Sequence, residues 1–188
     1  MLFPMGTDLM PAFNFSNKIT RFFILAALLY GAWFLLYELL IKPHTQIDER
    51  LIGVIISNSA FVLNLLGYTT YRAVEEDDMQ LLGIDGAHPI WIGTPCNAMT
   101  LFAFFTLFIL AFPGAQKQKW WFIPLGILII HAANLLRVIG LVLISYYQPA
   151  WLEFNHTYTF TVFVYAIIFS LWMWWVNFSL KKLKKNES

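Results

Sequence analysis

The sequence predicts an all-α polytopic membrane protein with about four or five transmembrane helices and a small extracytoplasmic β-hairpin. Hydrophobic residues make up 59% of the chain and charged residues only 12%, which is too apolar for a soluble domain of 188 residues. The apolar residues also gather into runs of about 18 or more, the length an α-helix needs to cross a bilayer. We therefore interpret residues 1–188 as a single transmembrane domain.

The N-terminal half predicts one clear span and one ambiguous helix. Residues 19–41 form an apolar run that is long for a signal-peptide core and lacks a small-x-small cleavage site, so we expect a retained span. Residues 51–68 are either a further span or a helix lying in the outer interface. Small and polar residues recur along that segment at helical spacing, which suits tight helix packing or an interfacial position: Gly53, Ser57, Ala60, Asn64 and Gly67. Lysine and arginine counts fit both arrangements equally.

The C-terminal half predicts three spans, at residues 96–113, 120–147 and 157–178. The middle one is too short for two spans and a turn, so we expect one long or broken helix. The positive-inside rule places the lysine-bearing loop at 117–119 and the lysine cluster at 181–185 in the cytoplasm. The segments 96–113 and 157–178 then both begin at the outer face.

Residues 69–95 differ in composition from the spans and predict an extracytoplasmic loop. Asp85-Gly86 is typical of a type I′ turn, and it is flanked by apolar residues at Leu82, Ile84 and 90–92. We expect a hairpin here whose second arm leads into the segment that begins at Cys96.

Cys96 is the single cysteine of the chain, and it stands at the start of an apolar segment. Thr94-Pro95-Cys96 is typical of a helix start, with Thr94 as N-cap and Pro95 at the first helical position. Unpaired backbone N–H groups and the helix dipole would favour the thiolate there and make Cys96 a nucleophile. The alternative is a buried structural cysteine.

Arg137 lies within the apolar segment 120–147. An arginine at the bilayer centre costs at least about 2.5–3.5 kcal/mol, so an ionisable group inside a span is a candidate functional residue. At about 1.5 Å rise per residue Arg137 lies ~25 Å above Trp120, close to the outer edge of the hydrocarbon core. Asn134, one turn earlier on the same helix face, is expected to orient the guanidinium. Arg137 would stabilise an oxyanion or bind a carbonyl, unless it only snorkels to the headgroups.

His156 opens the last span, at the same level as Cys96 and Arg137. As a general acid/base it would take the thiol proton or protonate a leaving amine; the alternative is an interfacial histidine without a role. His88, Cys96 and His156 match no zinc-ligand spacing, so we expect no metal and no cofactor. The terminal lysines are interpreted as a topology anchor, so no nucleic-acid partner is expected.

Four motifs in this order resemble those of the exosortase/archaeosortase family. They are Pro95-Cys96-Asn97, Phe112-Pro113-Gly114 with its lysine loop, Asn134-Leu135-Leu136-Arg137, and His156 at the start of the last span. The resemblance covers roughly residues 51–178, and the length of the chain is similar to that of small, single-domain members of the family. One departure is Ala98, where the family usually has glycine. The change leaves a reshaped substrate channel or lost activity open, although the retained cysteine, arginine and histidine favour an active enzyme.

The resemblance implies a cysteine protease or transpeptidase in a bacterial plasma (inner) membrane, with its active site on the extracytoplasmic side. Its partners would be membrane lipids and secreted proteins whose C-terminal sorting signal combines a short motif, a transmembrane helix and a basic tail. Cys96 would attack the scissile carbonyl, Arg137 would stabilise the oxyanion, and His156 would protonate the leaving amine. The acyl group would then pass to an envelope or surface acceptor.

Two other functions remain open from the sequence. One is a non-catalytic membrane assembly or structural protein, in which Cys96, Arg137 and His156 only pack or snorkel. The other is a thiol-dependent membrane acyltransferase that uses the same cysteine on a lipid substrate. Whether Cys96→Ser preserves function discriminates the first of these from an enzyme.

Overall fold

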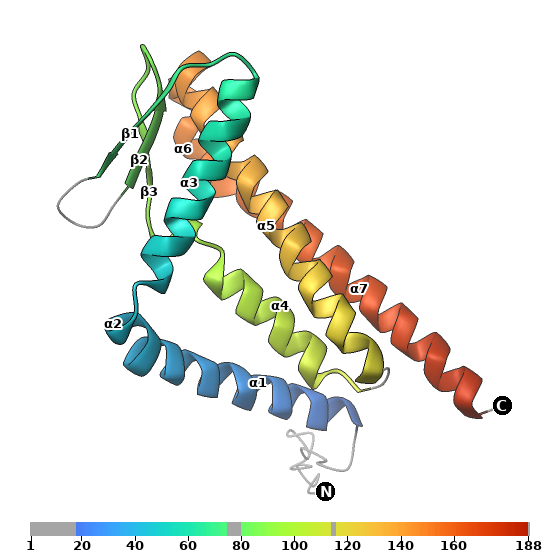
Figure 1. Ribbon diagram of the computed structural model, residues 1–188. Helices are drawn as coiled ribbons and strands as arrows, with labels where there is room; N and C mark the ends of the chain where they lie inside the picture. The colour runs from blue at the N-terminus through green and yellow to red at the C-terminus, as the bar shows by residue number, and fades with distance from the viewer. Residues whose placement is uncertain (1–17, 75–79, 114–115, 188) are drawn as a thin grey trace, which may run out of the picture.

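The computed structural model describes residues 18–74, 80–113 and 116–187. These segments are mostly helical and include one small antiparallel sheet, which confirms the all-α polytopic class (Figure 1). The main elements, in chain order, are α1 (Lys18–Leu36), α2 (Lys42–His44), α3 (Ile47–Leu65), β1 (Thr70–Val74), β2 (Gln80–Ile84), β3 (Ile90–Ile92), α4 (Met99–Ala111), α5 (Gln116–Tyr147), α6 (Leu152–Phe154) and α7 (Phe160–Glu187).

Within the described segments, three stretches are long and apolar enough to cross a membrane: Ile19–His44, Gln116–Tyr147 and Pro149–Lys182. Helix α4 is shorter. Its 13 residues rise about 20 Å, less than the ~30 Å thickness of a hydrocarbon core. The segment expected to be helical from residue 96 begins its helix only at Met99, because the preceding turn holds residues 94–98 in another conformation.

Helix α3 corresponds to the ambiguous segment 51–68 and is not among those three stretches. It packs on α5 and on strands β1 and β2. Two residues of its small and polar stripe contact β1: the Ser57 hydroxyl accepts a hydrogen bond from Arg72 Nη1 at 3.1 Å, and Asn64 Oδ1 accepts one from the Thr70 hydroxyl at 3.0 Å. Ser57 and Asn64 are nevertheless exposed, and a Cβ on Gly53 would meet only Gln80 Oε1, at 4.0 Å. Both expectations for this stripe, tight packing and an interfacial position, stay predictions.

The predicted hairpin is present, with β2 and β3 paired antiparallel so that Leu82 lies opposite Ile90. Strand β1, which the sequence did not predict, pairs with the other edge of β2 and gives the order β1-β2-β3. The prediction of a type I′ turn at Asp85-Gly86 is wrong. Ala87 N donates to Ile84 O at 3.0 Å, but of the two central residues only Gly86 has positive φ (+87°), whereas type I′ needs both.

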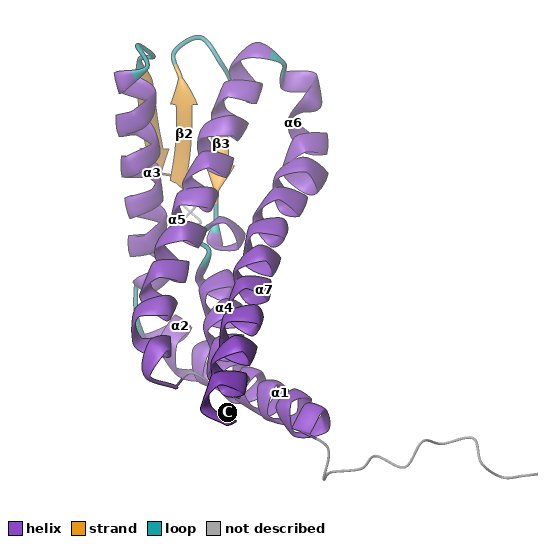
Figure 2. Cartoon of the chain, turned by 90° about the vertical axis from the view of Figure 1, so that its right-hand side faces the viewer, coloured by secondary structure: helices purple, strands orange, loops and turns teal. Residues whose placement is uncertain are grey.

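Two apolar clusters hold the fold together. The first lies between α3, the sheet and the C-terminal part of α5, and includes Ile55, Leu63 and Leu82. The second lies between α4, α5 and α7, around Phe105 and Trp175. Figures 1 and 2 show the sheet and α1 at opposite ends of the molecule, with α4 between them and the long helices α5 and α7 running from the sheet toward the other end. The turn that carries Cys96 connects β3 to α4, so it lies where the two clusters meet.

Two glycines in α5 let neighbouring helices approach closely. A Cβ on Gly126 would lie 2.1 Å from Phe105 Cζ, and one on Gly140 would lie 2.4 Å from Phe160 Cζ. Rings from α4 and α7 thus occupy the space where side chains of α5 would stand. Small residues at helix crossings have this function in membranes, where close packing stabilises helix association.

Candidate active site

Cys96 lies in a 3₁₀ turn, Thr94–Cys96, that precedes α4. Cys96 N donates to Gly93 O at 2.8 Å, and Asn97 N donates to Thr94 O at 3.2 Å. Thr94 is the first residue of this turn, and Gly93 stands at its N-cap position. Instead, Asn97 Oδ1 accepts a hydrogen bond from Met99 N at 2.9 Å, so Asn97 caps α4. The expectation of Thr94 as N-cap and Cys96 at the second helical position is therefore wrong, and the helix-dipole argument for the thiolate loses its basis.

Ala98 explains why the helix begins late. Its φ is +63° and its ψ is 5°, the left-handed conformation, and it is buried. A left-handed residue cannot continue a right-handed helix, and the conformation costs an L-residue with a Cβ roughly 1–2 kcal/mol. Glycine adopts it without that cost. The family that the sequence resembles usually has glycine at this position, and glycine fits this backbone. In this chain alanine adopts the same conformation under strain.

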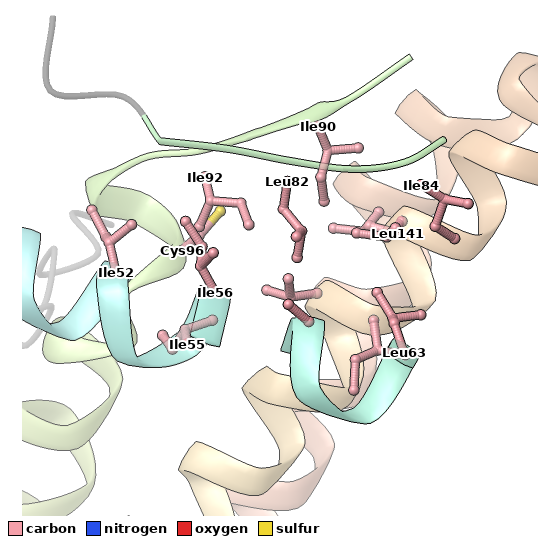
Figure 3. Close-up of a cluster of buried hydrophobic side chains, with 14 residues drawn as sticks. Ile52, Ile55, Ile56, Leu63, Leu82, Ile84, Ile90, Ile92, Cys96 and Leu141 are labelled. Atoms are coloured by element: carbon pink, nitrogen blue, oxygen red, sulfur yellow. The ribbon is translucent and has the colours of Figure 1, made fainter. Parts of the chain in front are cut away.

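The thiol of Cys96 lies in an apolar environment. Its exposed fraction is 7%, and it belongs to the cluster formed with the sheet and α3. Figure 3 shows its sulfur beside Ile92 of β3, with Ile56 of α3 nearby. The chain leaving β3 thus places the thiol between the sheet and α3.

Asn134 of α5 fixes the backbone of this turn. Its Nδ2 donates to the carbonyl oxygen of Cys96 at 2.7 Å, and its side chain is fully buried. The sequence predicts that Asn134 orients Arg137, but its hydrogen bond goes to the cysteine residue. Its Oδ1 is buried without a hydrogen-bond partner. Asn134 therefore connects the turn to the helix that also carries Arg137.

Arg137 and His156 meet across α5 and the segment before α7. Arg137 Nη2 lies 3.4 Å from His156 Nε2, at the long end of the hydrogen-bond range. A guanidinium has only donors, so a hydrogen bond here requires Nε2 to be unprotonated. His156 lies in the π-helical turn Asn155–Thr159, whose irregular geometry carries the chain from the 3₁₀ turn Pro149–Trp151 and α6 into α7.

Two pockets adjoin these residues. Cys96 and His156 line the first, of about 330 Å³, together with β3 and apolar residues of α5 such as Val138 and Leu141. Arg137 lines the second, of about 280 Å³, with Thr94 and Asn97. The contact between Arg137 and His156 joins a wall of one pocket to a wall of the other. An extended acyl compound in the first pocket would therefore face a thiol and an imidazole, with a guanidinium next to the imidazole.

Two residues that no sequence motif marks support the turn. Asp48, in the first turn of α3, accepts a hydrogen bond from Asn97 Nδ2 at Oδ1. Tyr37 donates its hydroxyl to the same carboxylate, at 2.7 Å from Oδ1 and 2.6 Å from Oδ2. No motif marks this group, because its members lie 11 and 49 residues apart in the chain.

Two further histidines lie in different surroundings. The carbonyl of His88 accepts the Ser145 hydroxyl at 2.7 Å, and His44 Nδ1 contacts Leu40 O in the π-helical turn that follows α1. Within the described segments, no three His, Cys, Asp or Glu side chains come close enough together to hold a metal ion.

Comparison with known proteins identifies the family. The model of the transmembrane exosortase family matches residues 12–174, which include every residue of the site described above. The chain belongs to the transmembrane exosortase family. Searches of curated proteins and of solved structures found no match. Membership in the exosortases indicates a membrane transpeptidase or protease.

Proposed function

We propose that this exosortase is a cysteine transpeptidase that removes C-terminal sorting signals from secreted proteins and transfers the proteins to an envelope or surface acceptor. The observation that carries the proposal is the arrangement of three chemically matched side chains. Cys96 and His156 line one pocket, and Arg137 Nη2 lies 3.4 Å from the His156 imidazole. They come from the turn before α4, from α5 and from the segment before α7, so only the folded chain brings them together.

The first half of the reaction is acylation. His156 takes the proton of the Cys96 thiol, and the sulfur attacks the scissile carbonyl carbon. The C–S bond forms, the carbonyl electron pair moves onto oxygen, and Arg137 stabilises that oxyanion. When the intermediate collapses, the C–N bond breaks and His156 gives its proton to the departing amine. The product is a thioester on Cys96 and a released C-terminal peptide.

The second half is transfer. An acceptor amine or hydroxyl, or water, attacks the thioester carbonyl, and His156 takes the acceptor's proton. The C–S bond breaks, and the thiolate regains that proton from His156. The apolar lining of the pocket, from residues such as Ile90, Ile92 and Val138, limits the access of water to the thioester. That lining favours transfer over hydrolysis.

The sidedness of the site follows from charge. The ends of α5 and α7 that lie far from the site are rich in lysine. They carry Lys117 and the lysines at 181–185. The positive-inside rule assigns those ends to the cytoplasm. Cys96, Arg137 and His156 then lie toward the extracytoplasmic side of a bacterial plasma membrane, where secreted substrates arrive.

Mass spectrometry of C-terminal peptides from envelope proteins tests the proposal. Cells that produce the wild type are compared with cells that produce Cys96→Ser at matched levels. We expect one or more surface proteins to keep their hydrophobic C-terminal tail only in the Cys96→Ser strain. Identical profiles, with the variant stably made, would reject the proposal and favour a structural or lipid-directed role.

A further inference from the structure

A largely buried polar chain runs from α1 to the residue after Cys96. Tyr37 follows α1, Asp48 lies in the first turn of α3, and Asn97 follows the cysteine. Tyr37 and Asn97 are 6% and 2% exposed, and both donate hydrogen bonds to the Asp48 carboxylate. Asp48 itself is half-buried, and these donors replace part of the water around its carboxylate. It also lies at the N-terminus of α3, where the helix dipole favours negative charge.

Asn97 uses both ends of its amide. Nδ2 donates to Asp48 Oδ1, and Oδ1 accepts from Met99 N at 2.9 Å. The amide orientation is therefore fixed, because only the oxygen can accept from the backbone and only the nitrogen can donate to a carboxylate. By holding the Asn97 amide, Asp48 fixes the orientation of Asn97 at the end of the turn. The path of the backbone through the strained Ala98 depends on that orientation.

The peptide unit after Cys96 is held from two sides. Asn134 of α5 donates to the Cys96 carbonyl at 2.7 Å, and Asp48 of α3 accepts from the side chain of the next residue. Asn134 lies one turn before Arg137, and Asn97 lines the same pocket as Arg137. The two contacts thus fix the turn relative to both the guanidinium and the sheet.

We infer that Asp48 is a positioning residue for the cysteine, which acts through Asn97 and is supported by Tyr37. The inference rests on the proposed function for its catalytic consequence, but the clamp itself is a physical property of the thiol's surroundings. Without it, the turn would open toward solvent, and Cys96 would lose its alignment with His156 and Arg137. Alignment of reacting groups accounts for a large part of enzymatic rate enhancement.

A donor–acceptor exchange tests this directly. Asn97→Asp sets two carboxylates against each other in a largely buried place, which breaks the contact. Adding Asp48→Asn restores it: the amide introduced at position 48 donates through its nitrogen to the new carboxylate, its oxygen accepts from Tyr37, and the carboxylate still accepts from Met99 N. Asn64→Asp is the matched control. It makes the same chemical change on exposed α3 surface, where the Thr70 hydroxyl continues to donate to an oxygen.

The first readout is alkylation of Cys96, the single cysteine of the chain, by iodoacetamide in the purified full-length protein at pH about 10, where a thiol is largely ionised. We expect Asn97→Asp to raise the rate at least about fivefold, because the 7% exposed thiol becomes accessible. The double variant should return to within about twofold of the wild type, as should Asn64→Asp. An unchanged rate in Asn97→Asp, or a double variant as fast as Asn97→Asp, overturns the clamp.

The second readout is cleavage of a sorting-signal peptide at equal amounts of folded protein. We expect Asn97→Asp to lower kcat at least about tenfold with KM within about twofold, and the double variant to recover most of kcat. If Asn97→Asp lowers the melting temperature but leaves kcat intact, Asp48 only stabilises the fold and the positioning role is rejected. If Cys96→Ser cleaves as well as the wild type, the proposed function fails, while the alkylation result still decides the clamp.

Discussion

Asn134 Nδ2 lies 2.7 Å from the carbonyl oxygen of Cys96, and this hydrogen bond joins the turn that carries the thiol to the helix that carries Arg137. Asn134 is fully buried, and its partner is the last backbone carbonyl of the 3₁₀ turn Thr94–Cys96. The position of the thiol therefore depends on that of α5.

Removal of this bond should impair catalysis. Asn134→Ala leaves the Cys96 carbonyl buried without a donor, which costs about 1–3 kcal/mol. If that energy is expressed in the transition state, kcat falls about tenfold or more. The measurement is the initial rate of sorting-signal cleavage at matched folded protein, with Asn58→Ala, an exposed position on α3, as the control. A normal rate in Asn134→Ala would show that the bond has no part in alignment.

Ala98→Gly should stabilise the protein. The left-handed φ of +63° strains an alanine but not a glycine, and we expect a gain of about 0.5–1 kcal/mol in the free energy of unfolding. Ala103→Gly, also buried but within the regular helix α4, should destabilise by about 1 kcal/mol. Thermal unfolding in detergent measures both changes. If Ala98→Gly and Ala103→Gly changed the free energy of unfolding in the same direction, the left-handed conformation of Ala98 would be contradicted.

Lys119→Met should destabilise the C-terminal end of α4. Lys119 is buried, and its Nζ donates to Leu110 O at 2.8 Å and Phe112 O at 3.0 Å, so it satisfies carbonyls that α4 leaves unpaired. We expect a loss of about 1–3 kcal/mol. Lys117→Met removes the same charge from an exposed side chain nearby and should change stability by less than about 0.5 kcal/mol. Equal effects of the two substitutions would mean that charge, and not capping, matters here.

Gly126→Ala should weaken the packing of α4 on α5. The added Cβ would lie 2.1 Å from Phe105 Cζ, and overpacking of this kind costs about 1–3 kcal/mol. Phe105→Leu in the same chain should recover part of the loss, because it frees the space. Gly31→Ala in α1, where a Cβ meets nothing within 4 Å, should be neutral or slightly stabilising. Tolerance of Gly126→Ala without any shift in unfolding temperature would contradict the close approach.

The class of fold and the hairpin are predictable from the sequence because both follow from local patterns. Apolar runs predict spans, and a turn sequence between short apolar segments predicts paired strands. Strand β1 escapes prediction because the sequence after Thr70–Val74 is acidic and has no glycine, proline or asparagine to mark a turn before β2. The turn type at Asp85 and Gly86 was wrong because the sequence allows more than one turn with a positive φ at the glycine.

The candidate site is predictable only in part. Charge bias and helix rise predict that Cys96, Arg137 and His156 lie at one level, and the folded chain has Cys96 and His156 on one pocket with Arg137 beside the histidine. Their catalytic roles stay predictions. The helix start was wrong because nothing local reveals that Ala98 adopts a left-handed φ. The pairing of Asp48 with Asn97 depends on how α3 packs, which no local pattern encodes.

Formation of a thioester between Cys96 and the substrate is the step on which the proposed function depends. Purified protein is mixed with a sorting-signal peptide, quenched in acid within the first turnover, digested and examined by mass spectrometry. We expect a peptide containing Cys96 whose mass is increased by the N-terminal cleavage fragment, and neutral hydroxylamine should remove that fragment. Cleavage of the signal with Cys96 unmodified at every time point, and undiminished in Cys96→Ser, would contradict the thioester mechanism.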